Sequence, residues 1–171
     1  IGALLLLLPK SVNPGHSLSV VDAFFTSTSA VCVTGLATVD TPTTFSFLGR
    51  MIILGLIQIG GLGVMTITTF FAVLVQGQMS IGFRVMMREF LSSDGIAGIK
   101  SILRKIAILT ISIEIFGAVV IYFSLGGSVL SINPDLLFSS FFHSVSAFCN
   151  AGFSLYSDSL MSHTIQTNYM F

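Results

Sequence analysis

The sequence predicts an all-α integral membrane protein built from repeated units of helix, pore loop and helix. Hydrophobic residues make up 53% of the 171 residues and charged residues only 8%, whereas soluble domains carry about 25% charged residues. A passage of twelve residues also occurs twice, and seven of the twelve aligned pairs are identical: Phe24/Phe141, Phe25/Phe142, Ser27/Ser144, Ser29/Ser146, Ala30/Ala147, Cys32/Cys149 and Gly35/Gly152. Such repeats are typical of membrane proteins assembled from copies of one unit around an axis.

Two long apolar segments are predicted to cross the membrane. Residues 51–75 contain no charge and exceed the roughly 20 residues that span a bilayer, so we expect an inner helix over residues 45–75. Its glycines are expected to let a neighbouring backbone approach closely. Residues 106–125 contain a single charge, Glu114, and are expected to form the outer helix of a second unit. The apolar run 1–8 is expected to be the last part of a spanning helix, the outer helix of the first unit. Both chain ends are expected to be cut from a longer protein.

The distribution of charge predicts the orientation. Residues 76–105 hold five of the seven basic residues, namely Arg84, Arg88, Lys100, Arg104 and Lys105. Basic loops stay on the cytoplasmic side, so this loop is predicted to be cytoplasmic and the pore loops external, in a multi-pass protein of the plasma membrane. The formal net charge of the chain is zero, and no basic surface is available to neutralise nucleic-acid phosphates. We therefore expect the lipid bilayer, and no nucleic acid, as a partner.

The two copies of the repeat are predicted to be pore loops, at residues 18–40 and 134–158. In each, a half-helix of about 14 residues would rise roughly 21 Å, which is less than the ~30 Å hydrocarbon core. Each loop must therefore enter the membrane and return on the same side, as a re-entrant pore helix followed by an extended strand. Asn133, Pro134 and Asp135 predict the start of the second helix, because Asn caps a helix, Pro suits its first turn and an acid favours its dipole.

The extended strands after the half-helices are predicted to form an ion filter. A carbonyl filter binds cations through backbone oxygens, and glycine permits the dihedral angles that turn successive carbonyls the same way. The expected ligands are the carbonyl oxygens of Val33, Thr34, Gly35, Leu36, Asn150, Ala151, Gly152 and Phe153. Cys32 and Cys149 occupy matching positions beside these strands and are expected to support the filter as unpaired thiols. As an alternative, both glycines only end buried helices.

A family resemblance covers essentially the whole chain. The first copy from Thr26 to Leu36, the helix motif Gln58-Ile59-Gly60-Gly61-Leu62-Gly63 and the second copy from Phe142 to Phe153 carry it. Together they resemble the Trk/Ktr/HKT superfamily of potassium transporters, and most closely its bacterial Ktr-type membrane subunits. The resemblance implies a pore of four linked units. This chain would hold the first unit, residues 1–75, and the second, residues 106–171, up to the start of its inner helix.

The resemblance also implies a function and partners. It implies potassium uptake through the filter, with sodium as a candidate coupling or activating ion. A glycine at the position of Gly35 implies selectivity for potassium over sodium. Gating would come from a cytosolic nucleotide-binding ring of the RCK or KtrA-like type, and the full-length subunit would form a homodimer. The gate loop of the family belongs to the third unit, beyond residue 171.

Two polar residues in apolar surroundings need an explanation. We take Glu114 by default as a candidate functional residue, because a charge at the bilayer centre costs several kcal/mol. A pairing with a helix outside this chain, or a neutral carboxyl group, explains it equally well. His143 replaces Thr26 in the repeat, and we expect it to make a contact of the pore helix. A metal ligand is less favoured, since no second ligand stands at helical spacing and metal sites need several.

Two other classes of protein stay open. A secondary transporter with broken helices also uses repeats and glycine-rich interruptions, although its copies are commonly inverted, whereas both loops here are expected to enter from one side. An intramembrane serine protease could use a serine with His143. However, the sequence has no Gly-x-Ser-x-Gly motif, and the adjacent His143 and Ser144 cannot face one another on a helix. We therefore predict a transporter and not an enzyme.

Overall fold

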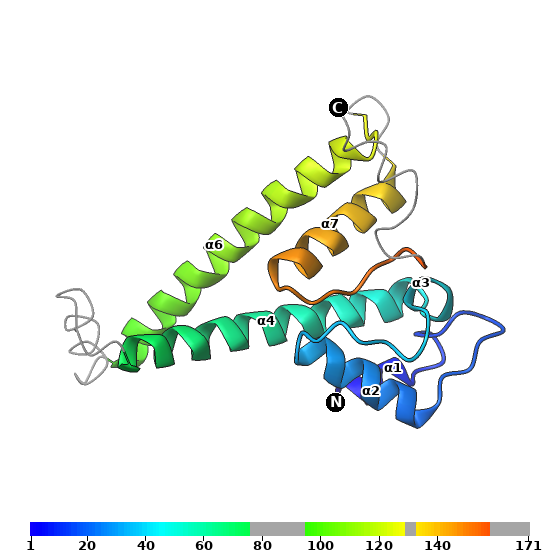
Figure 1. Ribbon diagram of the computed structural model, residues 1–171, viewed down its shortest axis with the longest axis horizontal. Coiled ribbons are helices and arrows are strands. Elements are labelled where there is room, and N and C mark those ends of the chain that lie inside the picture. The colour runs from blue at the N-terminus through cyan, green and yellow to red at the C-terminus, as the bar shows by residue number, and fades with distance from the viewer. Residues whose placement is uncertain (76–94, 129–132, 158–171) are drawn as a thin grey trace. The chain divides into compact units, whose positions relative to one another are not determined.

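The computed structural model describes the backbone of residues 1–75, 95–128 and 133–157, and the side chains of residues 1–63, 104, 106–128 and 133–157. Apart from an isolated antiparallel bridge, all regular structure there is helical: α1 (Gly2–Leu6), α2 (Val20–Val31), α3 (Thr41–Thr44), α4 (Phe47–Val75), α6 (Gly95–Ser124) and α7 (Pro134–Phe148), shown in Figure 1. The chain forms two compact units, one of Ile1–Gly61 with Glu114–Phe171 and one of Leu62–Ile113. The predicted all-helical class is thus confirmed for the described residues.

The long helices α4 and α6 depart from the prediction mainly at one end. α4 coincides with the predicted inner helix to within two residues. α6 begins at Gly95, so residues 95–105, predicted to belong to the cytoplasmic loop, are helical. Apolar residues recur at helical spacing between the basic ones there, and Lys and Arg are good helix formers. The rest of that loop, residues 76–94, and the predicted start of the second inner helix, within residues 158–171, lie outside the described residues.

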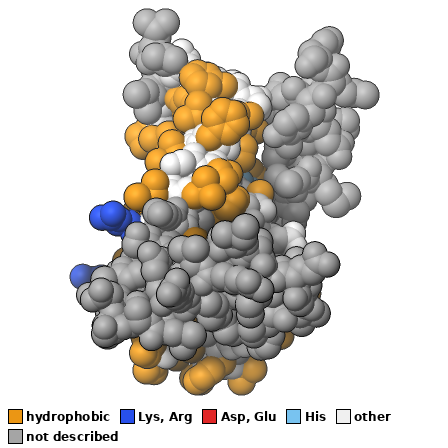
Figure 2. Space-filling view, turned by 90° about the vertical axis from the view of Figure 1, so that its left-hand side faces the viewer, with side chains coloured by type: hydrophobic (Ala, Val, Ile, Leu, Met, Phe, Trp, Pro, Cys, Tyr) orange, Lys and Arg blue, Asp and Glu red, His pale blue; other side chains and the backbone are white. Residues whose placement is uncertain are grey.

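α6 contains the segment best suited to a membrane. Among the residues whose side chains are described, Ile106–Ser124 is the one helix that is long and apolar enough to cross a bilayer, by length and composition, and most of it is exposed. Its exposed side chains include Ile108, Leu109, Ile111, Phe116 and Phe123. Figure 2 shows hydrophobic side chains gathered in the middle of its upper half, between the atoms drawn in grey. A large exposed apolar surface of this kind indicates coverage by lipid or by further protein.

The two predicted pore helices, α2 and α7, both begin at a side-chain cap. Asn133 caps α7 as predicted, because its Oδ1 accepts hydrogen bonds from two backbone N–H groups of the first turn, at 3.0 and 3.3 Å. Ser19 caps α2, where its Oγ accepts from the N–H of Asp22 and donates to its carboxylate. Hydrogen bonds from Ser19 and Thr38 hold the pKa of Asp22 below its usual value. A negative charge therefore stands at the positive end of the α2 dipole.

Three glycines let the long helices α4 and α6 approach α2 and α7 closely. A Cβ atom on Gly60 of α4 would overlap the carbonyl oxygen of Val31 at the end of α2, and one on Gly61 would overlap the thiol of Cys149. Gly117 of α6 meets α7 in the same way. The predicted role of glycine in the inner helix is confirmed for these two positions of α4. Gly55 and Gly63 of α4 face open space within the described part of the chain, whereas Gly49 meets the carbonyl oxygen of Ser11.

The core of the compact unit formed by Ile1–Gly61 and Glu114–Phe171 joins α1, α2, α4 and α7. Its buried apolar side chains include Leu6, Ala23, Ala30, Phe45, Ile53, Ile57, Phe142 and Val145. The same interior also buries small polar side chains of the two pore helices: Thr26, Ser27, Ser29, Ser139, Ser140, Ser144 and Ser146. Buried polar groups require hydrogen-bond partners, so these side chains restrict how α2 and α7 can be placed.

Glu114 on α6 connects this helix with α4 and α7. Its side chain is 2% exposed, and its Oε2 accepts a hydrogen bond from Nε2 of Gln58 on α4 at 3.2 Å. Its backbone carbonyl accepts a hydrogen bond from the Oγ of Ser144 on α7 at 2.6 Å. The second carboxyl oxygen, Oε1, has no partner among the described residues. The sequence left open whether Glu114 pairs with another helix, and α4 supplies that partner within this chain.

The cap of α7 provides a first prediction. Replacing Asn133→Ala leaves two N–H groups of the first turn without their acceptor, and should lower the stability of the full-length protein by about 1 kcal/mol. Asn133→Asp keeps an oxygen acceptor and should behave like the wild-type protein. Thermal unfolding of both variants in detergent checks this, and equal midpoints for the two would contradict the capping role.

The contact of Glu114 provides a second prediction. Glu114→Leu removes the acceptor for Gln58 and should lower stability by about 1–3 kcal/mol, the cost of an unmet buried donor. Glu114→Gln keeps an acceptor and removes any charge, so it should be at least as stable as the wild-type protein. Thermal midpoints in detergent separate the two variants. If Glu114→Gln loses as much as Glu114→Leu, the negative charge itself is required.

Candidate functional site

The chain takes the same backbone conformation after α2 and after α7. We call residues 33–36 the first return segment and residues 150–153 the second. Val33 and Gly35 have positive φ angles of 52° and 73°. The equivalent residues Asn150 and Gly152 have φ angles of 57° and 72°. Left-handed residues at alternate positions turn successive carbonyl groups toward one side, which an ordinary strand does not do.

Hydrogen bonds of the backbone fix both return segments to the preceding helix in the same pattern. In each segment the first N–H donates to the carbonyl three residues earlier, and the second N–H donates to the carbonyl five residues earlier. The distances are 3.3 and 3.0 Å in the first segment, and 3.0 and 2.7 Å in the second. Within the described part of the chain, the carbonyl oxygens of residues 33–36 and 150–152 accept no hydrogen bond. These oxygens are therefore available to a ligand.

The two return segments lie side by side at their glycines. A Cβ atom on Gly35 would lie 2.5 Å from the carbonyl oxygen of Ala151 and 3.0 Å from the Cα of Gly152. A Cβ atom on Gly152 would lie 3.3 Å from the Cα of Gly35. Both glycines also line one cavity of about 300 Å³, together with polar residues that include Thr38, Asp40, Ser154, Tyr156 and Ser157. The glycines of the two copies therefore face one polar space.

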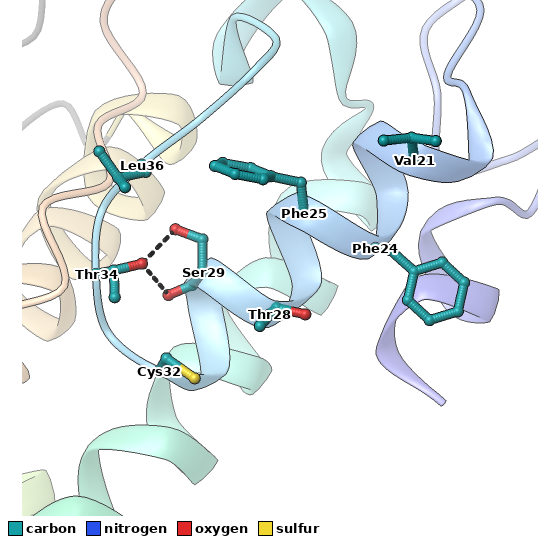
Figure 3. Close-up of a pocket in the computed structure, with 8 residues that line it drawn as sticks. All are labelled: Val21, Phe24, Phe25, Thr28, Ser29, Cys32, Thr34 and Leu36. Atoms are coloured by element: carbon teal, nitrogen blue, oxygen red, sulfur yellow. Dashed lines mark hydrogen bonds between the residues drawn. The ribbon is translucent and has the colours of Figure 1, made fainter.

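The first return segment is fastened by side chains on both of its sides. The Oγ1 of Thr34 donates a hydrogen bond to the Oγ of Ser29 on α2 at 2.9 Å, as Figure 3 shows. The chain that follows is held by Arg50 at the start of α4. Its guanidinium group donates to the carbonyl oxygens of Phe45 at 3.0 Å and Pro42 at 2.6 Å. Arg50 thus ties the loop after the first return segment to the beginning of α4.

The second return segment is held by a different set of bonds. The Oγ of Ser146 on α7 donates to the carbonyl oxygen of Phe153 at 2.7 Å. This carbonyl was predicted to be an ion ligand, but the bond turns it toward α7 and distinguishes it from the other seven. Ser146 is the repeat equivalent of Ser29, so both copies use a serine at this position, with different partners. A hydrogen bond also joins the loops that follow the two return segments, where the Oγ of Ser157 donates to the carboxylate of Asp40 at 2.9 Å.

The two predicted supporting cysteines occupy different surroundings. Cys149 is buried and Cys32 is exposed, and both are free thiols, as predicted. Cys149 packs against Gly61 of α4. Cys32 lines a groove of about 470 Å³ along α2, together with Phe24, Phe25 and Leu36 (Figure 3). Of the two cysteines only Cys149 therefore lies within the packed interior described here, and the support of the return segments by both stays a prediction.

His143 and Ser144 have separate partners and do not form a catalytic pair with one another. Ser144 donates to the backbone of Glu114 on α6, while the ring of His143 bonds to Ser139 on its own helix and to the chain after the second return segment. The predicted pore-helix contact of His143 is thus confirmed. Among the described residues, no group of three or more His, Cys, Asp and Glu side chains could hold a metal ion.

Sequence reasoning missed most of the side chains that fasten the return segments. A signal existed for Ser29 and Ser146, because they are one of the identical pairs of the repeat. Arg50 offered no such signal, since its partners are backbone carbonyls of a loop whose path the sequence does not reveal. The contact between Asp40 and Ser157 was also missed, because both residues lie beyond the twelve-residue passages, although they have the same separation of 117 residues as the two copies.

The arrangement is suited to a cation. The C-terminal ends of α2 and α7 lead directly into the return segments, and a helix C-terminus carries about half a negative charge. The unpaired carbonyl oxygens add further negative partial charge at the same place. Backbone oxygens in such a position can replace the water shell of an alkali metal ion.

Comparison with known proteins agrees with this chemistry. The family model for TrkH, a cation transport protein, matches residues 4–170. The chain is 42% identical over 168 residues to Ktr system potassium uptake protein B of Bacillus subtilis, covering 95% of this chain and 36% of the relative. It is 38% identical over 172 residues to potassium/sodium uptake protein NtpJ of Enterococcus hirae, covering 98% and 36%. It is 36% identical over 165 residues to Ktr system potassium uptake protein B of Vibrio alginolyticus, covering 94% and 34%.

The chain thus spans about a third of the length of the curated relatives that it matches. Their names are those of uptake proteins and not of enzymes, which agrees with the prediction of a transporter. The family match covers nearly the whole chain, and the predicted superfamily is confirmed. This chain belongs to the TrkH family of cation transport proteins, which are membrane proteins.

Proposed function

We propose that the chain forms part of a potassium-translocating pore, with the carbonyl oxygens of its two return segments as ion ligands. The observation that carries the proposal is the meeting of two segments with the same left-handed pattern at Gly35 and Gly152. The carbonyl of Phe153 is left out, because it bonds to Ser146. The proposed ligands are the carbonyl oxygens of Val33, Thr34, Gly35, Leu36, Asn150, Ala151 and Gly152.

Selectivity follows from replacing the water shell of the ion with fixed oxygens. The segments approach so closely that a side chain on Gly35 would overlap the carbonyl oxygen of Ala151, and one on Gly152 would make a tight contact with Gly35. The C-terminal ends of α2 and α7 then lower the energy of a cation beneath the segments. Two segments supply only part of a coordination shell. We propose that further units of the same type complete it, and the greater length of the relatives supports this.

The names of the relatives support potassium as the transported ion. Two of them are named for potassium uptake and one for potassium and sodium uptake. The glycine at position 35, in place of a residue with a side chain, favours potassium by resemblance to the family. Sodium, as a second transported, coupling or activating ion, is part of the proposal on the strength of the relative named for both ions.

We propose a plasma-membrane location with both pore loops external and residues 76–105 on the cytoplasmic side. The five basic residues of that segment support the orientation. Two relatives belong by name to a Ktr system, which supports other components of such a system as partners. By resemblance to the family, we propose a cytosolic nucleotide-binding ring as the regulatory partner and a homodimer of the full-length subunit. Residues 76–105 are the largest segment proposed to face that partner.

The proposal predicts the effect of a side chain at position 35. In the full-length protein, Gly35→Ser places a Cβ against the carbonyl of Ala151 at a residue with φ of 73°. It should reduce discrimination between potassium and sodium by about tenfold, which is a change of about 1.4 kcal/mol. Ion flux from liposomes with both ions competing measures this.

The matched control is Gly15→Ser. Gly15 has a similar φ of 87°, but a Cβ atom added there would have no other atom within 4 Å, so the backbone strain is comparable while the return segments are untouched. Its ion discrimination should equal that of the wild-type protein. Unchanged discrimination in Gly35→Ser would remove Gly35 from the filter, and absence of potassium flux in the wild-type protein would refute the pore.

The proposed partner predicts a pattern of crosslinks. Photoreactive groups placed along residues 76–105 of the full-length protein should capture the regulatory ring, because this segment holds most of the cytoplasmic positive charge. Photoreactive groups placed near Asp40, in the loop proposed to be external, should not capture the regulatory ring. Mass spectrometry of the crosslinked products locates the contacts. Capture from the outer loop alone would reverse the proposed orientation.

A further inference from the structure

We propose that His143 is a positioning residue for the second return segment, which it holds through an unprotonated Nε2 that serves as a hydrogen-bond acceptor. The inference rests on the proposed role of that segment in ion selection and names a residue that controls it. His143 lies on α7, and its side chain is 9% exposed. Its ring bridges the pore helix and the residues directly after the segment, Ser154 to Tyr156.

The hydrogen bonds of the ring fix its tautomer. Nδ1 lies 2.7 Å from the carbonyl oxygen of Ser139, and a carbonyl can only accept, so Nδ1 carries a proton. The backbone N–H of Leu155 donates to Nε2 at 3.3 Å, so Nε2 carries none. The hydroxyl of Ser154 lies 3.1 Å from Nε2 and is a second donor to it. The imidazole is therefore neutral and has its lone pair directed at the returning chain.

Ring packing holds the same acceptor in place. The ring of Tyr156 stacks on the imidazole, with centroids 4.9 Å apart and planes inclined by 19°. The hydroxyl of Ser139 donates to the hydroxyl of Tyr156 at 3.0 Å. Tyr156 therefore contacts both the ring of His143 and the hydroxyl of Ser139, the residue of α7 whose carbonyl oxygen also bonds to that ring. These contacts leave the imidazole little freedom to rotate.

The two copies of the repeat differ at this position. Thr26 is the equivalent of His143 in the first copy, and its buried Oγ1 has no hydrogen-bond partner among the described residues. The first return segment is instead fastened through Thr34 and Ser29. The hydrogen bonds from Ser154 and Leu155 to a histidine ring, which we call the histidine clamp, are therefore found only in the second of these two copies. Thr26 provides a natural control for any substitution at position 143.

Two substitutions separate the acceptor from the rest of the ring. In His143→Gln the amide oxygen can take the place of Nε2 and accept from Leu155. In His143→Asn the shorter amide can still donate to Ser139, but it cannot reach Leu155, whose N–H then loses its acceptor. In the full-length protein, His143→Asn should lower discrimination of potassium against sodium about tenfold, while His143→Gln stays within about threefold of the wild-type protein.

Competitive uptake of potassium and sodium into liposomes measures the discrimination, normalised to the amount of folded protein. Thr26→Val is the matched control and should leave discrimination unchanged, since its hydroxyl makes no bond within the described part of the chain. The inference is overturned if His143→Asn discriminates as the wild-type protein does, or if His143→Gln falls as far as His143→Asn. A wild-type protein that shows no preference for potassium would instead refute the proposed function, and the inference with it.

A further variant decides the question if neither substitution at position 143 yields folded protein. Ser154→Ala keeps the imidazole and removes one of the two donors to Nε2. A loss of discrimination in the same direction as expected for His143→Asn, but smaller, supports the clamp. Unchanged discrimination in Ser154→Ala overturns it.

Discussion

The rest of the structure depends on a constraint of backbone geometry. A segment that turns successive carbonyls the same way needs left-handed residues, and only glycine adopts that conformation without a penalty. Gly35 and Gly152 meet the requirement, but Val33 and Asn150 carry a Cβ at φ angles of 52° and 57°. This conformation costs roughly 1–2 kcal/mol at Val33 and less at Asn150, because asparagine adopts it more readily. The backbone bonds to the ends of α2 and α7 must offset this cost.

The two copies keep the same main chain with different side chains around it. Their return segments share φ angles and the pattern of hydrogen bonds to the preceding helix. The first is fastened by a hydroxyl of its own, Thr34. The second is fastened from α7, by Ser146 and His143. Because the proposed ligands are backbone oxygens, the side chains behind them are free to differ as long as the main chain stays in place.

Much of this could be predicted from the sequence, because repeats, apolar length and caps are local signals. The cap at Asn133, the inner helix and the family all follow from such signals. The start of α6 at Gly95 was missed because the basic residues there were taken to mark a loop. The bond that turns the carbonyl of Phe153 toward α7 was missed because it depends on how two elements meet. The partner of Glu114 was hidden for the same reason, since Gln58 lies on another helix.

Two contacts described above join a residue to its own counterpart. Asp40 and Ser157 are separated by 117 residues, and the same separation relates Gly35 to Gly152. Equivalent residues of a duplicated unit can touch only near the symmetry axis that relates the copies. A side chain there faces its own duplicate, so an aspartate would face an aspartate and the two like charges would repel. Glycine against glycine carries no such conflict, whereas the carboxylate is tolerated because the second copy has a hydroxyl donor instead.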